Sequence, residues 1–402
     1  MSVFNKADIL IPKNVDFEKW SVVACDQYTS QPEYWEKVKA FVGDAPSSLK
    51  LVYPEAFLSE GDARIKSINA EMEKYLKEGI FSVLKDSLIY VERTLNNKKI
   101  RRGIVGAVDL EEYNYLKGSK SKIRATEGTV ISRIPPRVKI RRNAPLELPH
   151  AILLINDEKD GVFSKVDKGD ELYSFDLFAG GGHIAAWRIK ESAANEVVSA
   201  LDKYEENAKD SLAYAVGDGN HSLAAAKACW EEIKTTLSEG ERKTHPARYC
   251  LVELENIQHS AQEFEPIHRV VYGVGLEKVM NDLKRFYSVE KDATEPNAQR
   301  LDIISGGEKT KVYITNPKSN LTVGSLQCFI DEMGYEADYI HGEDALCEIA
   351  AKEGAVGFIL PKPSKDELFE TVIADGALPR KTFSMGEANE KRYYLEAKKI
   401  RS

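Results

Sequence analysis

A carboxylate, an amide, an imidazole and a hydroxyl stand close together in one short stretch of this chain, and two glycines bracket the carboxylate. The stretch reads Gly217-Asp218-Gly219-Asn220-His221-Ser222. Glycines let the backbone take positive φ and let a ligand approach without a Cβ in the way. The polar side chains can donate to an anion, orient an acceptor or move a proton. We therefore predict that this corner binds a phosphate or carboxylate group.

The residues around the corner predict a strand before it and a helix after it. Residues 212–216 are mostly apolar, and Leu223, Ala226, Trp230 and Ile233 recur at helical spacing. A helix leaves its first amides without acceptors, and its dipole makes that end positive, so an anion is expected there. Ordinary turn and N-cap chemistry explains the same residues, and the sequence leaves both interpretations open.

A second candidate segment, residues 122–129, mixes two cations, two hydroxyls and one carboxylate. In it Arg124 and Thr126 are predicted to bind an anionic or hydroxylated substrate. Glu127 is predicted to take a proton from a substrate hydroxyl. A solvated loop is the alternative interpretation of this segment.

Single residues elsewhere complete the predicted site. Glu92 is an alternative base, and Arg93 is a further phosphate ligand. His183 follows three glycines between two β-like runs, which predict a flexible hairpin that could carry it to the site. Asp26 and Tyr28 could also face a ligand, although a turn aspartate and a packed tyrosine explain them as well.

The expected fold class is α+β or mixed α/β. Residues 87–94 and 101–108 are rich in β-formers and flank a polar Asn-Asn turn, which predicts an antiparallel hairpin and argues against a purely parallel sheet. We expect residues 1–237 to form a domain with a mixed sheet and the corner. Residues 238–402 are expected to form a smaller α+β domain.

Three further segments carry weaker structural predictions. Residues 131–150 are rich in Lys and Arg before a Pro-rich close, and they predict a basic strand and a linker. Residues 303–307 predict a turn. The basic and aromatic residues 381–394 predict a closing strand that packs back onto the fold.

Composition excludes several classes of partner. The chain has 402 residues and a net charge of −8, which disfavours binding to a nucleic-acid backbone. No apolar run is long enough to span a membrane, and the start lacks a secretory signal, so a cytoplasmic protein is expected. The 5 cysteines are scattered and indicate neither a disulfide framework nor a zinc site. We expect a small anionic ligand, no nucleic acid and no membrane, and a homodimer stays an open alternative.

Several motifs, in order, make the chain similar to a known family. GDGNHSLAAAK resembles the Asp-Gly-His-His-Arg-x-x-Ala signature of DUF1015, a mostly bacterial family of proteins of unknown function. Further matches are CDQYTSQPEYW, IYVERTL, RRGIVGAVDLEEY, KIRATEGTVISR, HIAAWRI, RYCLVELEN and EPIHRVV, so the resemblance covers nearly the whole chain. This chain has Asn220 where the first His is usual and Ser222 where the Arg is usual. It therefore lacks a rigid fork suited to phosphate.

The family signature in turn looks like that of the ParB/sulfiredoxin-like superfamily, which includes nucleotide-binding proteins and free-serine kinases. The resemblance implies a ParB-like N-terminal domain and ATP or ADP with Mg²⁺. On this basis the corner holds phosphate, Asp218 binds Mg²⁺ or orients the acceptor, and His221 donates to developing charge. Glu127 or Glu92 would take the hydroxyl proton.

We predict from these features a nucleotide-dependent phosphotransferase acting on a small hydroxylated or amino-acid-like metabolite. The alternative is a ParB-like regulatory protein that binds a nucleotide or metabolite without turnover. A metal-dependent hydrolase using Asp218, His221 and His183 is a third hypothesis, but the chain has no compact ligand pair such as H-x-x-x-H. The chain also contains no Walker-type loop and no protein-kinase signature.

Overall fold

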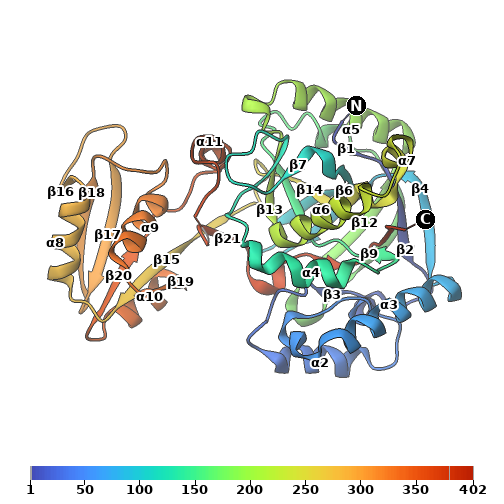
Figure 1. Ribbon diagram of the computed structural model, residues 1–402, viewed down its shortest axis with the longest axis horizontal. Coiled ribbons are helices and arrows are strands. Elements are labelled where there is room, and N and C mark those ends of the chain that lie inside the picture. The colour runs from blue at the N-terminus through green and yellow to red at the C-terminus, as the bar shows by residue number, and fades with distance from the viewer. Residues whose placement is uncertain (1, 380, 402) are drawn as a thin grey trace. The chain divides into compact units, whose positions relative to one another are not determined.

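The computed structural model describes residues 2–379 and 381–401, and the chain divides into two compact units (Figure 1). The first unit is built from the chain up to Ala125, from Thr129–Gln262 and from Glu387 onward. The second consists of Thr126–Gly128 and Glu263–Gly386. The expected division at residue 237 differs from this one because β14 (Tyr249–Asn256) is an inner strand of the first unit's sheet.

A large mixed sheet organises the first unit. Its strand order is β11-β12-β5-β6-β14-β10-β13-β8-β7, and β1 (Phe4–Asn5) pairs with β6. The other strands are β11 (Lys168–Asp176), β12 (His183–Ile189), β5 (Ile89–Thr94), β6 (Ile100–Asp109), β10 (Ile152–Ile155), β13 (Tyr214–Asp218), β8 (Ile123–Ala125) and β7 (Tyr113–Asn114). β5 and β6 form the predicted antiparallel hairpin, whereas β10 runs parallel to β14 and β8 parallel to β13. The predicted mixed α/β fold is therefore confirmed.

Helices cover both faces of this sheet (Figure 1). One hydrophobic core joins Val105, Ala107 and Leu251 of the sheet to α2 (Pro32–Val42) and α3 (Gly61–Glu78). The other core joins the opposite sheet face to α5 (Glu191–Glu206) and α6 (Asn220–Lys234). Smaller elements of this unit are β2 (Ala7–Pro12) paired with β4 (Phe81–Ser87), α1 (Phe17–Trp20) and α7 (Glu239–Thr244).

The basic residues after 131 form a helix, so the predicted basic strand is wrong. α4 spans Ile134–Arg141 and has prolines at its first positions. Proline suits the first turn of a helix because the missing N–H has no intrahelical acceptor there. Ile134 and Val138 then pack against Ala224, Ala225 and Cys229 of α6.

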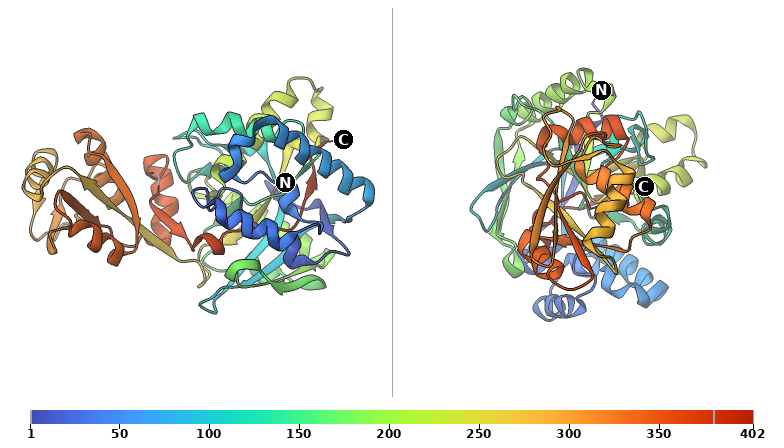
Figure 2. Two further views of the ribbon diagram at one scale, coloured as in Figure 1. Left: turned by 90° about the horizontal axis from the view of Figure 1, so that it is seen from below. Right: turned by 90° about the vertical axis from the view of Figure 1, so that its left-hand side faces the viewer.

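The C-terminal segment, defined here as residues 387–401, returns to the first unit (Figure 2). The closing strand predicted over residues 381–394 is wrong in its first part, because residues 381–386 belong to the second unit. β22 (Tyr393–Tyr394) pairs with β3 (Val22–Val23), and β23 (Lys398–Lys399) pairs with β9 (Leu146–Glu147). Directly before β22, Arg392, only 4% exposed, donates to Glu253 Oε2 at 2.7 Å and to Glu396 Oε2 at 2.6 Å. Buried charges therefore join this segment to β14.

The second unit has its own sheet, in the order β16-β18-β17-β20-β15-β19, with β21 paired to β15. Its strands are β15 (Phe264–Tyr272), β16 (Val289–Glu290), β17 (Gln299–Ser305), β18 (Glu308–Ile314), β19 (Ala337–His341), β20 (Ala355–Ile359) and β21 (Phe383–Met385). Its helices are α8 (Leu276–Phe286), α9 (Thr322–Met333), α10 (Glu343–Ala350) and α11 (Lys365–Asp375). The predicted turn at 303–307 is wrong in its first half, because the apolar residues 303–304 lie buried within β17.

Candidate functional site

The predicted corner of strand, turn and helix is present. β13 ends at Asp218, Gly219 follows in the left-handed conformation with a φ of 76°, and α6 begins at Asn220. A Cβ on Gly219 would come within 2.8 Å of the Ala151 Cα, so both the turn and the close approach require glycine. Gly217 does not take positive φ, because it lies within β13 where the pairing with β10 is irregular. The prediction for that glycine is wrong.

Replacing Gly219 with alanine is expected to destabilise the fold. The left-handed conformation costs a non-glycine residue about 1–3 kcal/mol, and the contact with Ala151 adds to that cost. Urea unfolding would measure the loss. Gly240→Ala is the matched control, since a Cβ at that exposed helical position meets nothing within 4 Å. Equal stability of the two variants would contradict the role of Gly219.

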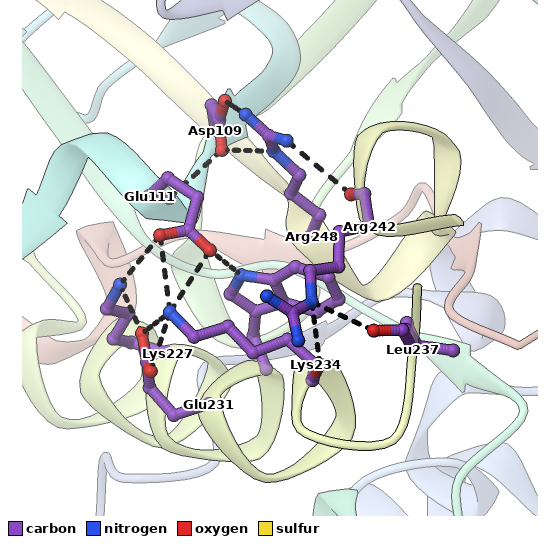
Figure 3. A network of polar contacts seen from close by, with 9 residues as sticks. Asp109, Glu111, Lys227, Glu231, Lys234, Leu237, Arg242 and Arg248 are labelled. Atoms are coloured by element: carbon purple, nitrogen blue, oxygen red, sulfur yellow. Dashed lines mark hydrogen bonds and ion pairs between the residues drawn. The ribbon is translucent and has the colours of Figure 1, made fainter. Parts of the chain in front are cut away.

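The C-terminal half of α6 is fixed by a network of polar contacts (Figure 3). The indole of Trp230 donates to Glu111 Oε1 at 2.6 Å, and Lys234 Nζ lies 3.2 Å from the same oxygen. Asp109, two residues before Glu111, accepts from Arg248 Nε at 2.9 Å. These contacts hold the helix to the chain that follows β6. The position of its first turn is therefore set without help from the polar side chains of the corner.

The first turn of α6 has free hydrogen-bond donors. Gly219 caps the helix with no side-chain acceptor. Within residues 2–379 and 381–401, the main-chain amides of Asn220, His221 and Ser222 have no hydrogen-bond acceptor. In the same residues the Oδ1 atom of Asn220, which is an acceptor and adds no donor to this set, is buried without a partner. An anion at this end would receive these donors and the positive end of the helix dipole.

Asp218 and Lys391 form an ion pair at this helix end. Asp218 Oδ1 accepts from the Gly219 amide at 2.9 Å, and Oδ2 lies 3.3 Å from Lys391 Nζ. Both side chains are mostly buried. The C-terminal segment thus brings an ammonium group to the corner, where it can neutralise a bound phosphate.

A second polar turn, after β3, supplies Asp26 near the same lysine. Asp26 Oδ2 lies 3.8 Å from His150 Nε2, and Oδ1 accepts from Gln27 Nε2 at 3.0 Å. Burial alone would raise the pKa of the Asp26 carboxyl. The electrostatic interaction with His150, the hydrogen bond from Gln27 and the charge of Lys391 outweigh burial and lower this pKa. Asp26 is therefore an ionised carboxylate that can accept a hydrogen bond from a substrate hydroxyl.

His221, in the first turn of α6, is a neutral donor. Its Nε2 accepts a hydrogen bond from the Val130 amide at 3.2 Å. Burial, together with the positive charges of Arg137 and Arg133, lowers the pKa of its imidazole to about 4. The imidazole is therefore uncharged at neutral pH, and its proton is on Nδ1. It can donate one hydrogen bond to developing charge, as predicted for it, but it adds no positive charge.

The pKa of His221 predicts a specific pH dependence of stability. An unfolded chain binds a proton on this residue below about pH 6.5, whereas the folded chain binds it only near pH 4. Acidification through this range therefore favours unfolding, and His221→Gln removes that contribution. We expect the unfolding free energy of wild type minus that of the variant, measured by urea unfolding, to fall as the pH is lowered from 7 to 4. A constant difference would contradict the assignment.

A small cavity of about 130 Å³ opens beside the helix end. Ser222 lines it together with Cys25, His150 and Tyr394, and its remaining wall is mostly aliphatic. Arg137 also lines it and pairs with Glu55. The cavity thus has polar groups beside the corner, and Tyr53, Arg141 and Glu147 also line it.

Two predicted phosphate ligands are used elsewhere. Arg93, 3% exposed, donates to the carbonyl oxygens of Gly181, Asn389, Glu390 and Lys391. Arg124, also 3% exposed, donates to Ser121 O at 2.9 Å and pairs with Asp210. Both guanidinium groups hold main-chain loops in place. Arg93 also binds the carbonyl oxygen of Lys391, the residue whose ammonium group lies at the corner.

Two further predicted site residues, Glu92 and His183, do not lie at the corner. Glu92 on β5 accepts from the hydroxyl of Tyr90 and pairs with Lys168 at 2.9 Å. His183 on β12 is bonded to Asp176 at 2.7 Å and is half exposed. β5 and β12 lie four and five strands away from β13 in the sheet order. Thr126 and Glu127 belong to the second unit, where Glu127 accepts from the Lys381 amide at 3.2 Å.

The sequence patterns did not point to His150, Arg137, Lys391 or Tyr394 as site residues. His150 immediately precedes the β10 region, and Arg137 belongs to a helix that was predicted as a strand. Lys391 and Tyr394 come from the C-terminal segment, far along the chain from the corner. Among the residues that sequence patterns did indicate, Asp26 was a candidate because it is a polar residue directly after an apolar run.

The described part of the chain has no candidate metal centre and no candidate membrane span. Among residues 2–379 and 381–401, no group of three or more His, Cys, Asp or Glu side chains could hold a metal ion. In the same residues no helix combines the length and the apolar character needed to cross a bilayer. Asp218, the predicted Mg²⁺ ligand, is instead paired with Lys391.

Fold and site together define a mixed α/β protein whose large sheet presents an open helix end beside an ammonium group and two carboxylates. A family model matches residues 9–333. The chain belongs to that family, described as protein of unknown function (DUF1015), which confirms the resemblance of the motifs. No curated protein matches the chain.

Solved structures with some likeness to the chain have low sequence identity. A free serine kinase mutant in complex with ADP is 13% identical, with a TM-score of 0.39 over 76% of this chain and 93% of that one. SbnI with a C-terminal truncation, from Staphylococcus aureus, is 12% identical, with a TM-score of 0.36 over 72% and 82%. A conserved hypothetical protein from Pyrococcus furiosus is 13% identical, with a TM-score of 0.34 over 72% and 95%. We therefore take the chemistry of the site from its own residues.

Proposed function

We propose that this protein is a phosphotransferase that moves a phosphoryl group from a nucleotide to the hydroxyl of a small metabolite. The observation that supports this most is the open first turn of α6, where free amides lie beside the Lys391 ammonium and the neutral His221. Phosphoryl transfer depends mainly on positioning and on neutralising charge, and these groups supply both.

Each group has a role in the proposed reaction. The amides of α6 and Lys391 hold the transferred phosphoryl group, and Nδ1 of His221 donates to its oxygens. The acceptor lies in the cavity beside Ser222 and His150. Its hydroxyl oxygen forms the new bond to phosphorus while the bond to the nucleotide oxygen breaks. Asp26 accepts the hydroxyl proton and takes the place of the predicted bases Glu92 and Glu127.

Magnesium would be held mainly by the substrate in this proposal. Mg²⁺ in such sites is commonly bound through one or two carboxylates together with substrate phosphates. Asp218 could supply one carboxylate oxygen if Lys391 turned from it to the phosphate. The proposed reaction therefore needs no metal cage made by the protein alone.

The proposal is tested by adding ATP or ADP with Mg²⁺ to the purified protein and following phosphorus by NMR. Small hydroxylated acids, amino acids and sugars serve as acceptors. Nucleotide consumption that depends on an acceptor, with a new phosphate ester, supports the phosphotransferase. Tight nucleotide binding without turnover would overturn it in favour of the regulatory alternative. Consumption without any acceptor would indicate a hydrolase instead.

A further inference from the structure

Hydrogen bonds of the Tyr394 hydroxyl connect His150 to the turn that carries Asp26. Tyr394, in β22, pairs with Val22, so its ring is brought beside the turn that carries Cys25 and Asp26. Its hydroxyl oxygen accepts from the Cys25 amide at 3.2 Å and lies 2.8 Å from His150 Nδ1. Both Tyr394 and His150 are more than nine-tenths buried, so water does not compete for these bonds.

The hydroxyl has one proton and two candidate acceptors. Cys25 Sγ lies at 3.1 Å and His150 Nδ1 at 2.8 Å. A neutral imidazole nitrogen is a much better acceptor than a sulfur atom, so the proton is expected to point at His150. The imidazole then has its own proton on Nε2, on the side of Asp26. The opposite tautomer would direct a lone pair at the Asp26 carboxylate.

We propose that Tyr394 is a positioning residue that holds His150 in the tautomer protonated on Nε2, with this N–H directed at Asp26. The Tyr394 hydroxyl donates to the neutral imidazole and can turn to accept from the protonated one, so Nε2 keeps its proton in both states. The polarity that His150 presents to the Asp26 carboxylate, 3.8 Å away, then depends on a residue of the C-terminal segment. This catalytic consequence rests on the proposed phosphotransferase function, whereas the tautomer itself does not.

Nitrogen-15 NMR of the full chain, labelled at its 7 histidines, tests the tautomer directly. The His150 signals are assigned by their loss in His150→Gln. In wild type we expect a protonated Nε2 and an unprotonated Nδ1, and in Tyr394→Phe a mixture of both tautomers. Tyr393→Phe is the matched control, because that neighbouring hydroxyl donates to Phe178 O at 2.9 Å instead. Cys25→Ala should leave the wild-type pattern unchanged.

Three results would overturn the proposal. The first is a wild-type His150 protonated on Nδ1, and the second is an unchanged pattern in Tyr394→Phe. The third is a change in Cys25→Ala, which would show that the hydroxyl proton belongs to the thiol. If Tyr394→Phe does not fold, the wild-type spectrum and Cys25→Ala still decide the question. Where turnover is found, Tyr394→Phe should lower it by about 10–100-fold while nucleotide binding is kept. Absence of turnover in wild type would count against the proposed function alone.

Discussion

Replacement of Asp26 by asparagine is expected to lower the rate of phosphoryl transfer by about 10²–10⁴-fold, the usual contribution of a general base. The amide keeps the shape of the side chain but cannot accept the hydroxyl proton. Nucleotide affinity should change little, because the phosphate-binding amides and Lys391 remain. Single-turnover rates and calorimetric binding of the nucleotide would separate the two effects.

The matched control is Asp176→Asn. Asp176 also pairs with a histidine, His183, but on β11, away from the corner in the sheet order. Its replacement should leave turnover unchanged. An equal loss of rate in both variants would show that a carboxylate next to an imidazole stabilises the fold in general. That result would contradict the proposed role of Asp26 as the general base.

The second large effect is expected at Arg392, where Arg392→Met should cost about 3–5 kcal/mol of unfolding free energy. Its guanidinium donates to Glu253, to Glu396 and to Pro149 O, and both carboxylates are buried. Removing the cation leaves them uncompensated. Denaturant unfolding at neutral pH measures the loss.

A combined variant separates lost charge compensation from lost packing. Adding Glu253→Gln and Glu396→Gln to Arg392→Met removes the orphaned charges, so part of the stability should return. Arg142→Met is the control, since its pair with Glu232 is half exposed and such pairs contribute about 1 kcal/mol or less. A loss at Arg142 as large as that at Arg392 would contradict the importance of burial.

Local patterns were sufficient for the elements next to the corner. The apolar run before Asp218 and the helical spacing after Ser222 predicted β13 and α6, and the Asn-Asn turn predicted the hairpin of β5 and β6. Each of these elements is determined mainly by residues that are neighbours in the sequence. α4 was missed because its two prolines suggest extended chain, although they occupy a first helical turn.

The residues of the site were harder to predict because they meet only after folding. Asp26, His150, Lys391 and Asp218 come from four distant parts of the chain. Arg93 and Arg124 have the chemistry of phosphate ligands, but their donors are taken by carbonyl oxygens and by Asp210. Which of two buried arginines faces a ligand depends on partners that a single sequence does not reveal.

The return of residues 387–401 to the first unit has a consequence for biosynthesis. During translation the strands of the large sheet emerge from the ribosome first, and most of the second unit follows. Lys391, Arg392 and Tyr394 emerge only afterwards. At about 5–20 residues per second, roughly ten seconds separate the emergence of β14 from that of these residues. During that interval the nascent sheet has neither the ammonium at its corner nor the cation between Glu253 and Glu396. The unfinished polypeptide would therefore be unable to carry out the proposed chemistry until translation reaches its last strands.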